Sequence, residues 1–122
     1  MEKKILICED DAMIGGMYKT KLEQEGYMVL LADNGASGLS MALSQKPDLI
    51  LLDIIMPQLD GFSVLQELRA SAKTKNTPII MLTNLSTDED KKKGDQFGAT
   101  DYLVKANLTP SQVGEAIKKY LV

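Results

Sequence analysis

The chain has 122 residues, of which 44% are hydrophobic, enough for one domain with one buried core and too few for a second domain. Its formal net charge is −3, so no overall positive field exists to hold a nucleic-acid backbone, and we expect no direct nucleic-acid binding. The sequence has no apolar run near the roughly 20 residues that cross a bilayer. We therefore expect one domain over residues 1–122, in the cytoplasm and away from membranes.

Strand-length apolar runs alternate with segments of helical spacing along the chain. The runs are Ile5–Cys8, Met28–Ala32, Leu49–Leu52, Ile79–Leu82 and Tyr102–Val104. Because they are apolar throughout, they are typical of parallel strands that are covered on both faces. Helical spacing follows within residues 14–22, 36–43, 62–68, 86–97 and 109–121. The alternation predicts a doubly wound α/β sheet with right-handed crossovers and helices on both faces.

Two of the predicted helices carry start signals. Thr109, Pro110 and Gln112 provide an N-cap, a proline at the first helical position and a capping-box partner. In the segment 86–97, Ser86 and Glu89 predict a second capping box. That segment is almost wholly charged, so we expect a short helix that is weakly anchored to the core.

Histidine is absent, which excludes acid–base chemistry and metal ligation by that residue. The single cysteine, Cys8, cannot form an internal disulfide, and its place in an apolar run predicts a small core residue.

Polar residues appear where the apolar runs stop. They are Glu9, Asp10 and Asp11 after the first run, Asp53 after the third, Thr83 after the fourth and Lys105 after the fifth. Ligands of doubly wound sheets bind beyond the carboxyl ends of the strands, so these residues are expected to converge. Carboxylates brought together repel one another and call for a cation, and an all-oxygen ligand set favours Mg²⁺ over zinc.

Such a site suits phosphoryl chemistry. Asp53 is a plausible nucleophile toward phosphorus, and Mg²⁺ and the Lys105 ammonium would offset charge on the transferring oxygens. Thr83 could donate its hydroxyl to one of those oxygens. Each residue alone has a simpler interpretation: acids after a strand often cap the next helix, as we expect of Asp11.

The whole chain resembles the receiver domains of two-component response regulators, of the single-domain, CheY-like kind. The matching segments are residues 5–11, 47–57, 60–61, 78–83 and 98–105, which read ILICEDD, PDLILLDIIMP, DG, PIIMLT and GATDYLVK. The resemblance implies a flavodoxin-like fold with five parallel strands in the order 2-1-3-4-5.

The resemblance also implies residue roles. Asp53 would be the phosphoacceptor, Asp10 a direct Mg²⁺ ligand, and Glu9 its partner, acting through water. The backbone carbonyl of Ile55 would supply a further ligand. The other residues implied are Thr83 as switch hydroxyl, Lys105 as phosphate-binding lysine and Tyr102 as switch aromatic.

Two positions depart from the family pattern. Ala106 stands where a proline joined by a cis peptide is common, so the loop after the fifth strand is expected to take another path. Asn84 stands where a smaller residue is usual, and its size could narrow access to Asp53.

As a receiver, the chain would act as a regulatory phosphoacceptor and not as a conventional enzyme. Its partners would be a histidine kinase or phosphotransfer protein and a downstream protein that binds the face of the helix at 86–97, the last strand and the last helix. Whether it forms a homodimer stays open, as does whether an output domain belongs to it.

The alternatives are a degenerate receiver that is never phosphorylated, an aspartyl-phosphate phosphatase, and a flavodoxin-like nucleotide or flavin module. A Gly-rich phosphate loop, which the last would need, does not follow the first strand.

Overall fold

The computed structural model describes residues 2–122, and within them the chain forms one parallel sheet of five strands in the order β2-β1-β3-β4-β5. The strands are β1 (Lys4–Cys8), β2 (Met28–Ala32), β3 (Leu49–Leu52), β4 (Ile79–Thr83) and β5 (Asp101–Val104). The predicted doubly wound sheet and its strand order are confirmed.

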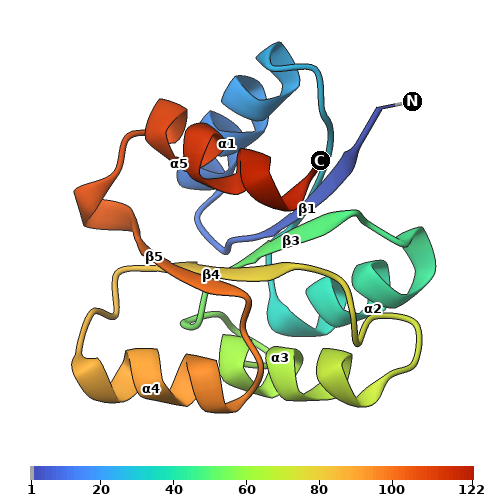
Figure 1. Cartoon of the computed structure of the whole chain (residues 1–122), viewed down its shortest axis with the longest axis vertical. Coiled ribbons are helices and arrows are strands. Elements are labelled where there is room, and N and C mark those ends of the chain that lie inside the picture. The colour runs from blue at the N-terminus through green and yellow to red at the C-terminus, as the bar shows by residue number, and fades with distance from the viewer. Residues whose placement is uncertain (1) are drawn as a thin grey trace.

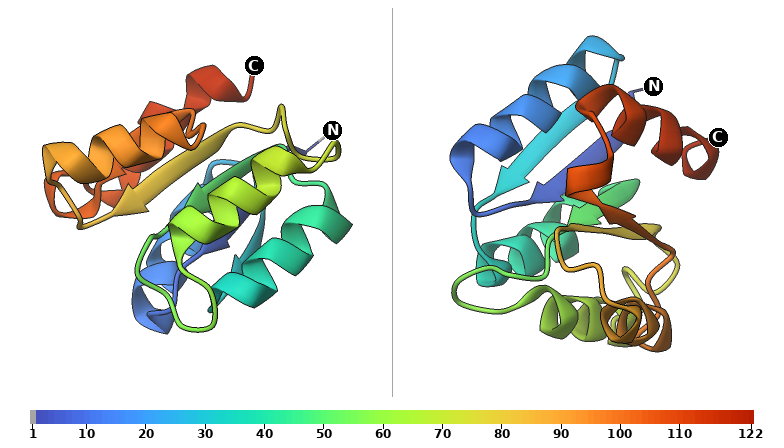
Figure 2. Two further views of the ribbon diagram at one scale, coloured as in Figure 1. Left: turned by 90° about the horizontal axis from the view of Figure 1, so that it is seen from below. Right: turned by 90° about the vertical axis from the view of Figure 1, so that its left-hand side faces the viewer.

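Helices cover both faces of the sheet (Figure 1). They are α1 (Ala12–Gln24), α2 (Gly35–Gln45), α3 (Gly61–Ala70), α4 (Asp88–Gln96) and α5 (Pro110–Ile117), with short 3₁₀ turns at Lys105–Asn107 and Lys118–Tyr120. The right-hand view of Figure 2 shows α1 and α5 on one face and α2, α3 and α4 on the other. Within residues 2–122 none of these helices has the length and apolar character that would let it span a bilayer.

The core consists of two clusters, one on each side of the sheet. In one cluster, Tyr18 and Leu22 of α1 and Val113 and Ile117 of α5 pack against side chains of β1, β3 and β4. The other is dominated by α3. Since β3 and β4 are buried along their whole length and β1 is buried from Ile5 to Cys8, polar side chains that follow these strands emerge at the strand ends.

The burial of individual side chains contradicts one expected core position, Met17, and confirms another, Cys8. In the segment 14–22, the helical spacing of the apolar residues predicts that Met17 faces the core with Ile14, Tyr18 and Leu22, but Met17 is 49% exposed. Cys8 is buried, and burial raises the pKa of its thiol to about 12, so it stays neutral and behaves as the predicted core residue.

The helix starts agree in part with the expectations. The capping box of Thr109 and Gln112 is present at the start of α5, and Asp11 caps α1 by accepting from the N–H groups of Met13 and Ile14. The capping box predicted at Ser86 and Glu89 is wrong.

Helix α4 is capped one residue later than predicted. Thr87 accepts from the N–H of Asp90 at 3.1 Å and donates its hydroxyl to the Asp90 carboxylate. Residues 85–87 precede the helix without regular secondary structure, and the carbonyl of Leu85 accepts a hydrogen bond from a side chain of β5. As expected, α4 is weakly anchored, and Gly94 is its one fully buried residue in the described helix.

A close backbone approach positions the loop after β3. Gly61, the first residue of α3, donates its N–H to the carbonyl of Ile54 at 2.8 Å. A Cβ at Gly61 would lie 2.0 Å from the carbonyl oxygen of Asp53. Only glycine fits there without moving the backbone that carries Asp53.

We predict that Gly61→Ala lowers the free energy of unfolding by about 2 kcal/mol, because the added methyl group overpacks against the Asp53 backbone. Gly16→Ala in α1 is the control, since a Cβ there has no neighbour within 4 Å. That change should raise stability by up to about 1 kcal/mol through helix propensity. Urea unfolding of the two variants measures both values, and equal effects would contradict this account of the loop.

Candidate functional site

Polar residues from four segments line one cavity of about 340 Å³ at the carboxyl edge of the sheet. The ladder sets their positions, because Cys8 pairs with Leu52 and Thr83 pairs with Val104. Glu9 and Asp53 therefore emerge side by side from β1 and β3, and Asn84 and Lys105 emerge side by side from β4 and β5, with β4 next to β3 in the sheet. The lining residues are Glu9, Asp10, Asp11, Ile14, Asp53, Ile55, Thr83, Asn84, Leu85 and Lys105.

Three carboxylates are close enough to share one cation. Glu9, Asp10 and Asp53 each offer an oxygen, and these atoms lie within 4.8 Å of one another. Glu9 and Asp53 are buried, whereas Asp10 is exposed. An all-oxygen donor set that combines buried and solvent-facing ligands fits Mg²⁺, which keeps part of its water shell.

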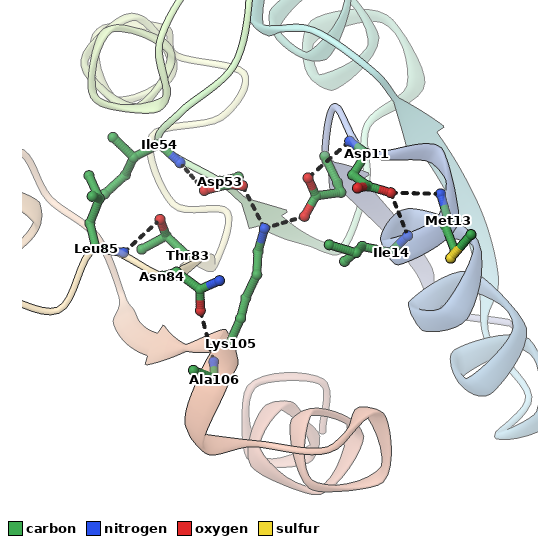
Figure 3. A network of polar contacts seen from close by, with 11 residues as sticks. Asp11, Met13, Ile14, Asp53, Ile54, Thr83, Asn84, Leu85, Lys105 and Ala106 are labelled. Carbon is green, nitrogen blue, oxygen red and sulfur yellow. Dashed lines mark hydrogen bonds and ion pairs between the residues drawn. The ribbon is translucent and has the colours of Figure 1, made fainter.

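A lysine lies between the two buried carboxylates (Figure 3). The Nζ of Lys105 donates to Asp53 Oδ2 at 2.6 Å and also to Glu9 Oε1. The side chain of Lys105 is only 10% exposed. The cluster as described therefore carries one buried positive charge against two buried negative ones.

The cluster shifts the pKa of two of its members. Burial raises the pKa of Glu9, and the hydrogen bond from Lys105 only partly offsets that rise. Burial alone would lower the pKa of Lys105, but its hydrogen bonds to Asp53 and Glu9 outweigh burial and raise it. Lys105 therefore stays charged.

Backbone contacts hold the Asp53 carboxylate in place. Its Oδ1 accepts from the N–H of Ile54 at 2.7 Å, while its own N–H donates to the carbonyl of Cys8 at 3.1 Å. With Oδ2 facing Lys105, both oxygens have fixed directions. The carboxylate is thus oriented before any ligand enters the cavity.

Thr83 and Tyr102, the predicted switch residues, meet at one loop residue. The hydroxyl of Thr83 accepts from the N–H of Leu85 at 3.3 Å, and the hydroxyl of Tyr102 donates to the carbonyl of Leu85 at 2.5 Å. Burial, with smaller effects from Asp90 and Asp53, raises the pKa of Tyr102 to about 12, so the phenol keeps the proton that it donates. The Tyr102 ring also contacts α4, since a Cβ at Gly94 would lie 3.2 Å from it.

The structure brings together the residues predicted for the site. Asp11 lines the same cavity but caps α1, as expected, and its N–H donates to Glu9 Oε2 at 3.1 Å. Ile55 lies at the cavity with a side chain that is 63% exposed. That its carbonyl ligates a metal stays a prediction.

The two departures from the family pattern are neighbours in space. Asn84 Oδ1 accepts from the backbone N–H of Ala106 at 2.9 Å (Figure 3). Every peptide bond among residues 2–122 is trans, so the loop after β5 has no cis bond at Ala106. The sequence places both residues just beyond paired strand ends, but the contact itself depends on the rotamer of Asn84, which sequence spacing does not encode.

Comparisons with known proteins agree on one family. The family described as response regulator receiver domain matches residues 5–118. The DNA-binding dual master transcriptional regulator RpaA of Synechocystis is 43% identical over 84% of this chain and 42% of its own length. The PhoP regulator of alkaline phosphatase synthesis in Bacillus subtilis is 39% identical over 99% of this chain and 49% of its own. The chain thus spans about half the length of the curated relatives it matches.

Solved structures agree with the sequence comparisons. The chemotaxis protein CheY4 of Vibrio cholerae has a TM-score of 0.92 and 32% identity, and the match covers 99% of this chain and 100% of that one. The BeF₃-activated receiver domain of RstA from Klebsiella pneumoniae has a TM-score of 0.90 and 29% identity over 98% of both chains.

We predict that Mg²⁺ raises the melting temperature of the protein. An ion among the three carboxylates binds the folded state and not the unfolded state, so it stabilises the fold. Asp10→Asn should weaken Mg²⁺ binding at least about tenfold. Mutating a residue that only hydrogen-bonds to a metal ligand can already cause a loss of that size. Asp11→Asn removes the same charge one residue away and keeps a capping side chain, so it should leave the affinity nearly unchanged. Calorimetric melting across a Mg²⁺ titration measures both, and equal losses would place the ion elsewhere.

Proposed function

Because this chain belongs to the response regulator receiver domain family, we propose that it is a signalling switch that takes a phosphoryl group onto Asp53. The donor would be the phosphohistidine of a histidine kinase or phosphotransfer protein. The observation that carries the proposal is the buried Asp53 carboxylate, fixed between the Ile54 N–H and the Lys105 ammonium at a cavity open to a donor.

Transfer follows from the placement of these groups. An Asp53 oxygen forms a bond to phosphorus as the phosphorus–nitrogen bond of the donor breaks, and the imidazole nitrogen keeps the electron pair. The Lys105 ammonium lies 2.6 Å from Asp53 Oδ2, so it can donate a hydrogen bond to an oxygen of the incoming phosphoryl group. Mg²⁺ held by Glu9, Asp10 and Asp53 would neutralise charge on the transferring group.

The signal would leave the site through Leu85. A phosphoryl group adds about two negative charges and strong acceptors, which favour donation by the Thr83 hydroxyl. Thr83 and Tyr102 both bond to Leu85, so a shift of Thr83 changes the contacts of Tyr102 and of α4. Helix α4 is the segment most easily displaced, because it buries only Gly94.

The readout surface would be the face of α4, β5 and α5. Tyr120, beyond α5, already bonds through its hydroxyl to Asp101 at the start of β5 at 2.7 Å, so the two elements are joined. Several relatives are named as transcriptional regulators, and only about half of their length is covered. We propose that residues 2–122 act by protein contact, through a downstream partner or through a second copy of the chain. The cytoplasmic location stays a prediction.

Beryllofluoride with Mg²⁺ mimics an aspartyl phosphate and tests the proposal. We expect NMR shifts at Tyr102 and through residues 86–97 in the wild type, and none in Asp53→Ala, which lacks the carboxylate. Wild-type spectra that do not change would favour a degenerate receiver, and the same shifts in Asp53→Ala would place the ligand outside this site. Turnover of an added phosphomonoester would favour the phosphatase alternative.

A further inference from the structure

The hydrogen bond between Asn84 and Ala106 joins the two strand ends that carry Thr83 and Lys105. The β4–β5 ladder ends at the pair Thr83 and Val104, so Asn84 and Lys105 are the first residues beyond the sheet. The Asn84 side chain reaches from one strand end to the backbone of the other, at 2.9 Å from oxygen to nitrogen (Figure 3).

The turn that carries Lys105 depends on such a contact. Residues Lys105–Asn107 form a 3₁₀ turn in which Ala106 and Asn107 are exposed, so packing holds the turn little. A second bond, from the N–H of Leu108 to the carbonyl of Lys105 at 3.2 Å, closes the turn on itself and does not tie it to β4. The Asn84 oxygen supplies that tie.

We infer that Asn84 is a positioning residue: by holding the Ala106 N–H, it fixes the backbone of the turn so that the Lys105 ammonium stays over Asp53. The inference rests on the proposed phosphoacceptor function and adds a residue to it. The bond requires a residue other than proline at 106, because proline has no N–H. Asn84 and Ala106 therefore work as a pair.

The chain path also couples Thr83 to this contact. Asn84 directly follows Thr83, so a shift of Thr83 toward a phosphoryl group carries the Asn84 backbone with it. Through the Ala106 bond, the same shift acts on the turn that begins at Lys105. The two phosphate-facing residues are thereby coupled through one side chain.

The test compares phosphorylation rates with a small-molecule phosphodonor and Mg²⁺. Asn84→Ala and Asn84→Leu both remove the acceptor, and leucine keeps the shape of asparagine. Both should slow phosphorylation about fivefold, the factor that one net hydrogen bond of about 1 kcal/mol represents. If Asn84 only narrows access to Asp53, Asn84→Ala should be faster than wild type and Asn84→Leu unchanged, which would overturn the inference.

Pairing the change with Ala106→Pro isolates the bond. In the Ala106→Pro background the donor is gone, so Asn84→Ala should have no further effect on the rate. An equal slowing in both backgrounds would show that Asn84 acts by another route. Ser86→Ala removes an exposed polar side chain from the same loop and should leave the rate unchanged.

Amide exchange at Ala106 reports the bond directly. Its N–H should exchange about fivefold faster in Asn84→Ala than in the wild type, while the strand amides keep their rates. No change at Ala106 would overturn the inference. A wild-type protein that is never phosphorylated, with the Ala106 amide still protected, would instead count against the proposed function on which the inference rests.

Discussion

A buried lysine between two buried carboxylates is the interaction on which the site depends. Charges taken out of water cost several kcal/mol each unless they are paired, so Lys105, Glu9 and Asp53 constrain one another. The sheet enforces this arrangement, because its central strands are covered on both faces and release polar side chains only at their ends. A parallel sheet of this order thus concentrates charge at one edge, the place where we propose that a cation and a phosphoryl group bind.

The two sides of the site differ in how firmly they are held. On the β3 side, Gly61 packs against the Asp53 backbone, and α3 contributes Phe62, Val64, Leu65 and Leu68 to the core. On the β4 side, the loop after Thr83 leads to α4, which contacts the Tyr102 ring at Gly94 and the Phe62 ring through Phe97 at its end. The Lys93 ammonium of α4 also lies 4.8 Å from the Phe62 ring. A firmly held carboxylate beside a loosely held helix is suited to turn a local change of charge into movement.

The sequence predicted the structure best where burial requires a run of apolar residues. Uniformly apolar runs located the strands, and the first polar residues after them identified Glu9, Asp53, Thr83 and Lys105 as neighbours. It was less informative where two signals compete locally: Ser86 and Thr87 both offer a capping hydroxyl, and Thr87 is the residue that caps α4. The exposure of Met17 and the bond from Asn84 to Ala106 depend on helix rotation and on a rotamer, which spacing does not encode.

The central claim is that the acidic cluster leaves Asp53, and no other carboxylate, ready to attack phosphorus. Mass-spectrometric mapping after incubation with a small phosphodonor and Mg²⁺ tests it most directly. We predict one hydroxylamine-labile phosphoryl group, as expected of an acyl phosphate, on the peptide that contains Asp53, formed only when Mg²⁺ is present. A phosphoryl group on Glu9 or Asp10, or one that forms equally well without the metal, would contradict the claim.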